Sequence, residues 1–137
     1  MKLIILLTAL TLLVGLSAHA QVSLIANQDV NASSVSVSKA KDLYSLSSSD
    51  LNGMKVKLFD FQADNSAKKQ FYDALDLSQV SLRKIWLKAK LTGNGTPPEM
   101  TGTEEEMISK IESTPGAVGY VSSSKVKGNV KVLLKID

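Results

Sequence analysis

Serine hydroxyls and clustered carboxylates are the groups of this chain that could do chemistry, as nucleophiles or as metal ligands. Serines are numerous, but the only histidine is His19 and no cysteine is present. A serine nucleophile needs a neighbouring base, so Ser-His hydrolysis has no support, and thiol chemistry has no residue to use. The shortage of His and Cys also argues against zinc and haem, which bind mainly through these side chains. We therefore expect no enzyme activity, no metal and no cofactor.

The acidic run Glu104–Glu106 could be a carboxylate cluster for catalysis or for calcium. Adjacent positions on a helix point in different directions, so three consecutive carboxylates do not converge on one ion. Thr103 and Glu106 have the spacing of a capping box, and acidic residues in a first turn suit the positive end of the helix dipole. The run therefore predicts the beginning of a helix rather than a site.

A basic set in the middle of the chain could meet nucleic acid or an anionic membrane: Arg83, Lys84, Lys88 and Lys90. Only Trp86 interleaves with these cations as an aromatic, and it falls on the apolar stripe of the same helix. The formal net charge is +3, which is too small to indicate nucleic-acid binding by itself. We expect a solvated helix face and no nucleic-acid partner.

Residues 1–20 have the pattern of a secretory signal peptide. A basic start precedes an apolar run at Leu3–Leu16, and small residues occupy the cleavage positions at Ala18 and Ala20. A membrane-spanning helix needs roughly 20 apolar residues, more than this run supplies. We therefore expect export, cleavage after Ala20, no membrane span in the mature protein and a single domain at residues 21–137.

Strand and helix patterns alternate along the rest of the chain, which predicts an α/β domain with a sheet covered by helices. Apolar runs predict four strands: Val22–Ala26, Met54–Phe61, Ala117–Val121 and Val130–Ile136. Caps and helical spacing predict four helices: Lys39–Leu46 after Ser38, one from Asp64 or Asn65 to about Leu75, one after Ser78, and one from Thr103 to Pro115.

Several side chains have an expected place in this domain. The helix after Ser78 should bury the residues that recur at helical spacing: Leu82, Ile85, Trp86 and Ala89. Gly116 and Gly119 fit a sharp turn into a strand better than ligand contact. The tyrosines are scattered in the sequence, and we expect them at the edges of the core rather than in a sugar-binding platform: Tyr44, Tyr72 and Tyr120.

Three segments in order carry a family resemblance: SKAKDLY at Ser38–Tyr44, IWLKAKLTGNGTPP at Ile85–Pro98, and TPGAVGYV at Thr114–Val121. They resemble small secreted bacterial proteins that are similar to substrate-binding proteins of phosphate ABC transporters. The resemblance covers roughly residues 22–136. It implies a type 2 periplasmic-binding-protein-like fold, a mixed β-sheet flanked by helices, of which this chain supplies one lobe. It also implies a periplasmic or secreted location.

Receptors of that family hold phosphate with a Ser-Gly-Thr turn at a helix N-terminus, together with an arginine and an acid. A helix N-terminus suits an anion because it offers unpaired N–H groups and a positive dipole. The resemblance places the tentative anion site on four residues: Asn65, Ser66, Ala67 and Lys68. Asn65 stands at the position of the turn's serine, and Gln62 lies near that of the arginine. Asp64 would repel an anion, and we interpret it as an N-cap.

The resemblance implies an exported solute-binding-like domain that binds phosphate or a similar small anion for an ABC transport system. A single lobe leaves one side of such a site open to water, so a protein partner or a homodimer would have to replace the other lobe. The alternative is a ligand-less envelope accessory, or a protein-interaction module, built on the same lobe.

Overall fold

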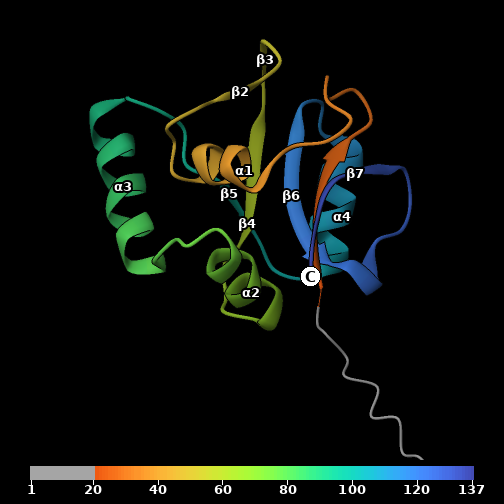
Figure 1. Ribbon diagram of the computed structural model, residues 1–137. Helices are drawn as coiled ribbons and strands as arrows, with labels where there is room; N and C mark the ends of the chain where they lie inside the picture. Colours follow the sequence, from red (N-terminus) through yellow and green to blue (C-terminus); the bar gives the residue numbers. More distant parts are fainter. Residues whose placement is uncertain (1–20) are drawn as a thin grey trace, which may run out of the picture.

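A mixed five-stranded sheet in the order β5-β4-β6-β1-β7 forms the centre of the computed structural model, which describes residues 21–137 (Figure 1). The strands are β1 (Val22–Asn27), β4 (Lys57–Phe61), β5 (Glu99–Thr101), β6 (Ala117–Ser122) and β7 (Val130–Ile136). β1 is antiparallel to β6 and β7, whereas β4 is parallel to β5 and β6. The predicted fold class is confirmed. The expected signal peptide at residues 1–20 lies outside the described residues.

Residues 21–137 form four α-helices around the sheet: α1 (Val37–Tyr44), α2 (Ser66–Ala74), α3 (Gln79–Thr92) and α4 (Glu104–Ser113). α4 packs on β6 and β1 from one face, and α1 and α2 cover the opposite face (Figure 1). α3 lies at the left of that view, and its Trp86 Nε1 donates a hydrogen bond to Tyr44 O of α1 at 2.8 Å. None of the helices in residues 21–137 has the length and apolarity needed to cross a membrane.

Two consecutive residues of β6 set the distances between the sheet and its helices. A Cβ added to Gly119 would lie 2.6 Å from Met107 Sδ and 2.7 Å from Ile111 Cδ1, so α4 packs directly on the backbone of the strand. The next side chain, Tyr120, points to the opposite face and stacks on Phe71 of α2, with ring centroids 3.9 Å apart. Gly119 is thus required by packing, whereas Gly116, with φ of 73°, supplies the expected turn.

Local capping signals set two helix starts as predicted. Thr103 and Glu106 form the capping box at the start of α4, and the Ser78 hydroxyl caps α3. The predicted inner face of α3 is wrong at Ile85, which is 38% exposed. The other predicted residues of that face are buried: Leu82, Trp86 and Ala89.

The predicted bounds of α1 are wrong at both ends. Ser36 rather than Ser38 is the N-cap, because its hydroxyl accepts a hydrogen bond from Lys39 N at 3.0 Å. The helix ends at Tyr44 and does not reach Leu46, which has a positive φ of 62° that is incompatible with a right-handed helix.

The single strand predicted at Met54–Phe61 is two strands. Met54–Lys55 is β3, which forms a hairpin with β2 (Asp50–Leu51) around the predicted Asn52-Gly53 turn. The backbone N–H of Val56 donates to Ser49 O at 3.1 Å, and β4 then joins the central sheet. β5 was not predicted, because three residues are too few for a visible period.

Candidate functional site

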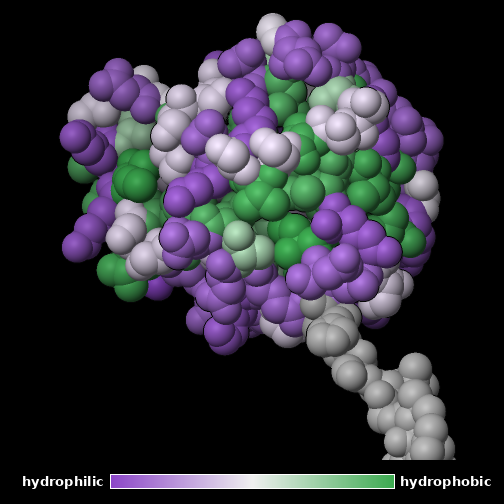
Figure 2. Space-filling model, viewed as in Figure 1, coloured by the Kyte–Doolittle hydropathy of each residue, from purple (hydrophilic) through white to green (hydrophobic). Residues whose placement is uncertain are grey.

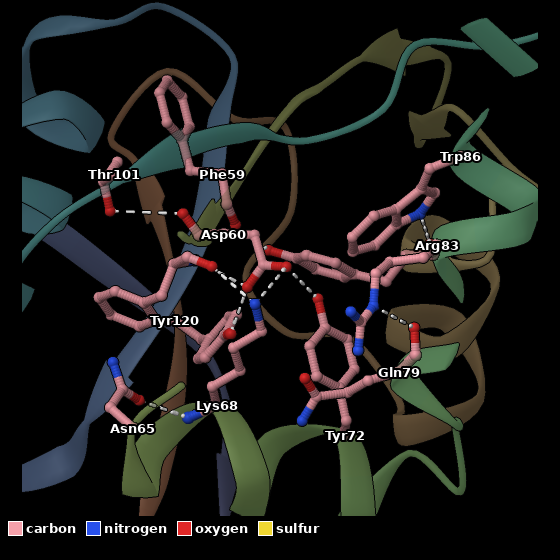
Figure 3. Close-up of polar contacts among 12 residues, drawn as sticks. Phe59, Asp60, Asn65, Lys68, Tyr72, Gln79, Arg83, Trp86, Thr101 and Tyr120 are labelled. Carbon is pink, nitrogen blue, oxygen red and sulfur yellow. Dashed lines mark hydrogen bonds and ion pairs between the residues drawn. The ribbon is translucent and has the colours of Figure 1, made fainter. Parts of the chain in front are cut away.

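A fully buried carboxylate, Asp60, lies near the end of β4, and Lys68 and Tyr72 of α2 point toward it (Figure 3). The Tyr72 hydroxyl donates to Oδ2 at 2.6 Å, and the Tyr120 hydroxyl and the Phe61 N–H donate to Oδ1. Lys68 Nζ lies 3.8 Å from Oδ2 and donates to Phe61 O at 2.7 Å. A buried charge persists only when it is paired and hydrogen-bonded, and Asp60 meets both conditions. Asp60 is therefore a structural group that fixes Lys68.

The three tyrosines meet around this carboxylate, so the prediction that they lie at the edges of the core is wrong. Each is at most 1% exposed, and the ring centroids are 6.1 to 6.2 Å apart. Tyr44 donates to Phe59 O at 2.8 Å. Burial, and secondarily the Asp60 charge, raises the pKa of all three hydroxyls, which are therefore neutral hydrogen-bond donors. An aspartate inside the apolar stretch LFDF was the sequence signal that could have revealed this cluster.

The four predicted site residues lie together at the start of α2, but they face different ways. Asn65 is the N-cap, in place of the predicted Asp64, and its Oδ1 accepts from Lys68 N at 2.7 Å. Ser66 is exposed, whereas Ala67 is 2% exposed and belongs to the core. Lys68 points inward to Asp60 (Figure 3). Within the described residues no hydrogen bond involves the N–H of Ser66 or Ala67. Only Ser66 of these two lines a cavity, so its N–H is the donor that a ligand could reach.

Two adjoining cavities lie beside this helix start. The smaller one, about 330 Å³, is at the first turn of α2 and is lined by Asp64, Asn65, Ser66, Lys69 and Gln79. The larger one, about 450 Å³, lies between α2, α3 and β5 and is lined by Gln62, Ala63, Asp64, Lys68, Tyr72, Gln79, Leu82, Arg83, Trp86 and Met100. Asp64 and Gln79 line both cavities, so the two cavities are neighbours, and we treat them together as the candidate site.

Two cations and one carboxylate set the charge of the larger cavity. Lys68 contributes through Nζ, but nearby Asp60 offsets its charge. The exposed Arg83 donates from Nε to Gln79 O at 3.4 Å and makes no ion pair in the described part of the chain. Asp64 opposes both cations. The sequence predicts that Arg83 lies on a solvated helix face. The side chain is indeed exposed, and it also lines the larger cavity.

Three solved structures of bacterial proteins have the same fold. A Clostridium perfringens protein described as a phosphate ABC transporter substrate-binding protein, with bound phosphate, superposes with a TM-score of 0.68 at 14% identity. An ABC-type phosphate transport receptor from Vibrio cholerae gives 0.64 at 14%, and a protein of Planctomyces limnophilus described as phosphate-binding gives 0.56 at 11%. The matches cover 83% of this chain but only 45%, 46% and 41% of those proteins, respectively.

Neither a protein-family model nor a curated protein matches the sequence. The likeness to solved structures is confined to the fold because the identities are so low. The chain spans less than half the length of each neighbour. The fold of residues 21–137 is therefore that of one lobe of a periplasmic binding protein, as the sequence resemblance implied.

Proposed function

We propose that this protein is a solute-binding domain that binds a small oxyanion, such as phosphate, between the start of α2 and Arg83. The observation that carries the proposal is that Ser66 at the start of α2, Lys68 and Arg83 line two adjoining cavities. A helix start attracts anions, and a guanidinium is suited to hold two oxygens of one oxyanion. The fold shared with proteins that are named for phosphate binding supports the same ligand class.

Affinity in this site should be modest. Asp64 and Asp60 offset part of the positive charge, and Ser66 and Arg83 are exposed residues. Hydrogen bonds made in contact with water contribute less than buried ones. A second lobe, a protein partner or a second copy of this chain would cover the open side and strengthen binding. We propose that the domain then delivers its ligand to an ABC transport system outside the cytoplasmic membrane, as the neighbours' names and the predicted leader suggest.

The test is thermal unfolding of the purified protein with phosphate, sulfate, molybdate and small carboxylates. A ligand at 100 times its Kd adds about 2.7 kcal/mol of stability, which raises the midpoint measurably. Ser66→Asp places a negative charge at the helix start and should abolish the shift. Ser81→Asp, in the first turn of α3 and outside both cavities, is the matched control and should retain it. No shift with any anion would refute the proposal.

One observation favours the alternative, a lobe that contacts another protein and binds no solute. α3 exposes an apolar stripe opposite its buried face, with Val80 at 59%, Leu87 at 59% and Leu91 at 78% exposure. Apolar patches show among hydrophilic side chains on this side of the molecule, at the left of Figure 2. Exposed apolar stripes often mark protein contacts. Sedimentation of the protein and of Leu87→Asp tests this: self-association that the substitution abolishes supports the alternative, and a monomer in both cases excludes a homodimer through α3.

A further inference from the structure

The larger cavity has an apolar, partly aromatic wall that an inorganic oxyanion would leave unused. The rings of Tyr72 and Trp86 both line it, with centroids 6.4 Å apart and planes inclined by 59°. Leu82 and Met100 extend this wall, and Met100 is 43% exposed. Sites for organic ligands have volumes of roughly 300–1,000 Å³, apolar and aromatic walls and a few polar groups. At about 450 Å³ this cavity is in that range.

The polar groups of the cavity stand beside that wall. Gln79, Leu82, Arg83 and Trp86 occupy positions i, i+3, i+4 and i+7 of α3, so they share one face of the helix. The Arg83 side chain lies between Trp86 and Gln79 in Figure 3. Its guanidinium has five N–H donors, of which only Nε is engaged in the described structure, by Gln79 O. A cation with unused donors thus stands next to an aromatic surface.

We propose, on the basis of the oxyanion site proposed above, that the preferred ligand is an organic anion whose headgroup contacts Arg83 and Lys68 and whose apolar body packs against Trp86 and Met100. The headgroup is a phosphate or a carboxylate, since both present paired oxygens to a guanidinium. An inorganic oxyanion makes the same polar contacts but leaves the exposed part of Met100 uncovered. The organic ligand therefore binds more tightly because it buries apolar surface in addition.

Trp86 provides the measurement, since it is the only tryptophan of the chain and lines the cavity. The purified protein is titrated with phenyl phosphate, inorganic phosphate, benzoate and phenol, and Trp86 emission is followed. We expect phenyl phosphate or benzoate to bind at least tenfold more tightly than inorganic phosphate, a difference of about 1.4 kcal/mol. The better of the two identifies the headgroup. Phenol, which has no anionic oxygens at neutral pH, should bind more weakly than either.

The four affinities together distinguish failure of this inference from failure of the oxyanion proposal. Equal affinity for inorganic and phenyl phosphate would overturn the organic ligand and leave the oxyanion site in place. Phenol binding as tightly as the anions would refute any role for Arg83 in holding a headgroup. No binding by any of the four compounds would overturn both proposals.

Variants test the two halves of the site. Arg83→Gln should weaken binding of the organic anion about tenfold, whereas the neighbouring Lys84→Gln, outside the cavity, should change it less than twofold. Met100→Gln should reduce the preference for phenyl phosphate over inorganic phosphate. Both residues are exposed, so neither substitution removes part of the core. A preference unchanged by Met100→Gln would refute the apolar contact.

Discussion

Raising the pH above about 10 should unfold this protein and ionise all of its tyrosines in one transition. The chain has three tyrosines, and all of them are buried around Asp60. Burial and the Asp60 charge raise the pKa of each hydroxyl in the folded state. In the unfolded chain a tyrosine ionises near pH 10. Above that pH the folded protein therefore retains three protons that the unfolded chain releases.

The sign of the effect follows from these proton numbers. Stability falls with pH wherever the folded state binds more protons than the unfolded state. The contribution of the three neutral hydroxyls is complete below about pH 10 and is lost as the pH rises toward the folded-state pKa values. One retained proton lowers the free energy of unfolding by about 1.4 kcal/mol per pH unit, so three lower it by about 4 kcal/mol per unit. A domain of ordinary stability, about 5–15 kcal/mol, cannot withstand more than a few such units.

Tyrosinate absorbance and far-ultraviolet circular dichroism, recorded on one alkaline titration, measure this directly. We expect the two curves to coincide. Denaturant titrations at several alkaline pH values should give a slope close to three protons for the wild type and two for Tyr72→Phe. A tyrosine that titrates with a midpoint near pH 10 while the dichroism stays native would refute the reasoning, because that hydroxyl would have to reach water in the folded state.

Three substitutions test the packing, capping and hydrogen bonding described above. Gly119→Ala forces a methyl group against two buried α4 side chains and should lower the free energy of unfolding by about 1–3 kcal/mol; an unchanged urea midpoint would contradict the tight contact. Thr103→Ala removes half of the capping box and should lower the free energy of unfolding by about 1 kcal/mol in the same assay. An unchanged urea midpoint would mean that the cap does not stabilise α4. Tyr72→Phe removes a hydrogen bond to the Asp60 carboxylate and should cost about 1.5–3 kcal/mol near neutral pH, and a smaller loss would mean that water replaces the hydroxyl.

Features that depend on neighbouring residues could be predicted from the sequence. The Thr103–Glu106 capping box and the Asn52-Gly53 turn each depend on a few adjacent positions, and both are present. α1 was misplaced because Ser36 and Ser38 are equally good caps in isolation. The break at Val56 could not be predicted, because the alternating pattern continues through a point where the chain changes its partner strand.

Features that depend on tertiary contacts were not visible in the sequence. Tyr120 and Asp60 are 60 positions apart and yet share a hydrogen bond, so tyrosines that look scattered in the sequence form one cluster. The start of α2 is a local feature and lies where the sequence predicts it, whereas anion binding by its four residues stays a prediction. Arg83 was assigned to solvent, because only the packing of α3 beside α2 brings its side chain to the cavity.

The position of β1 has a consequence for the order in which the chain can fold. β1 is the first described strand to leave the ribosome, yet it lies between β6 and β7, the last two strands to be synthesised. The Ser23 and Ser123 hydroxyls, 100 positions apart, are 2.7 Å from each other across this pairing. Contacts between residues so distant in the sequence form late, and proteins that depend on such contacts fold slowly. β1 therefore has no partner in the sheet until synthesis is almost complete, so the nascent chain cannot close its sheet before β6 and β7 have been made.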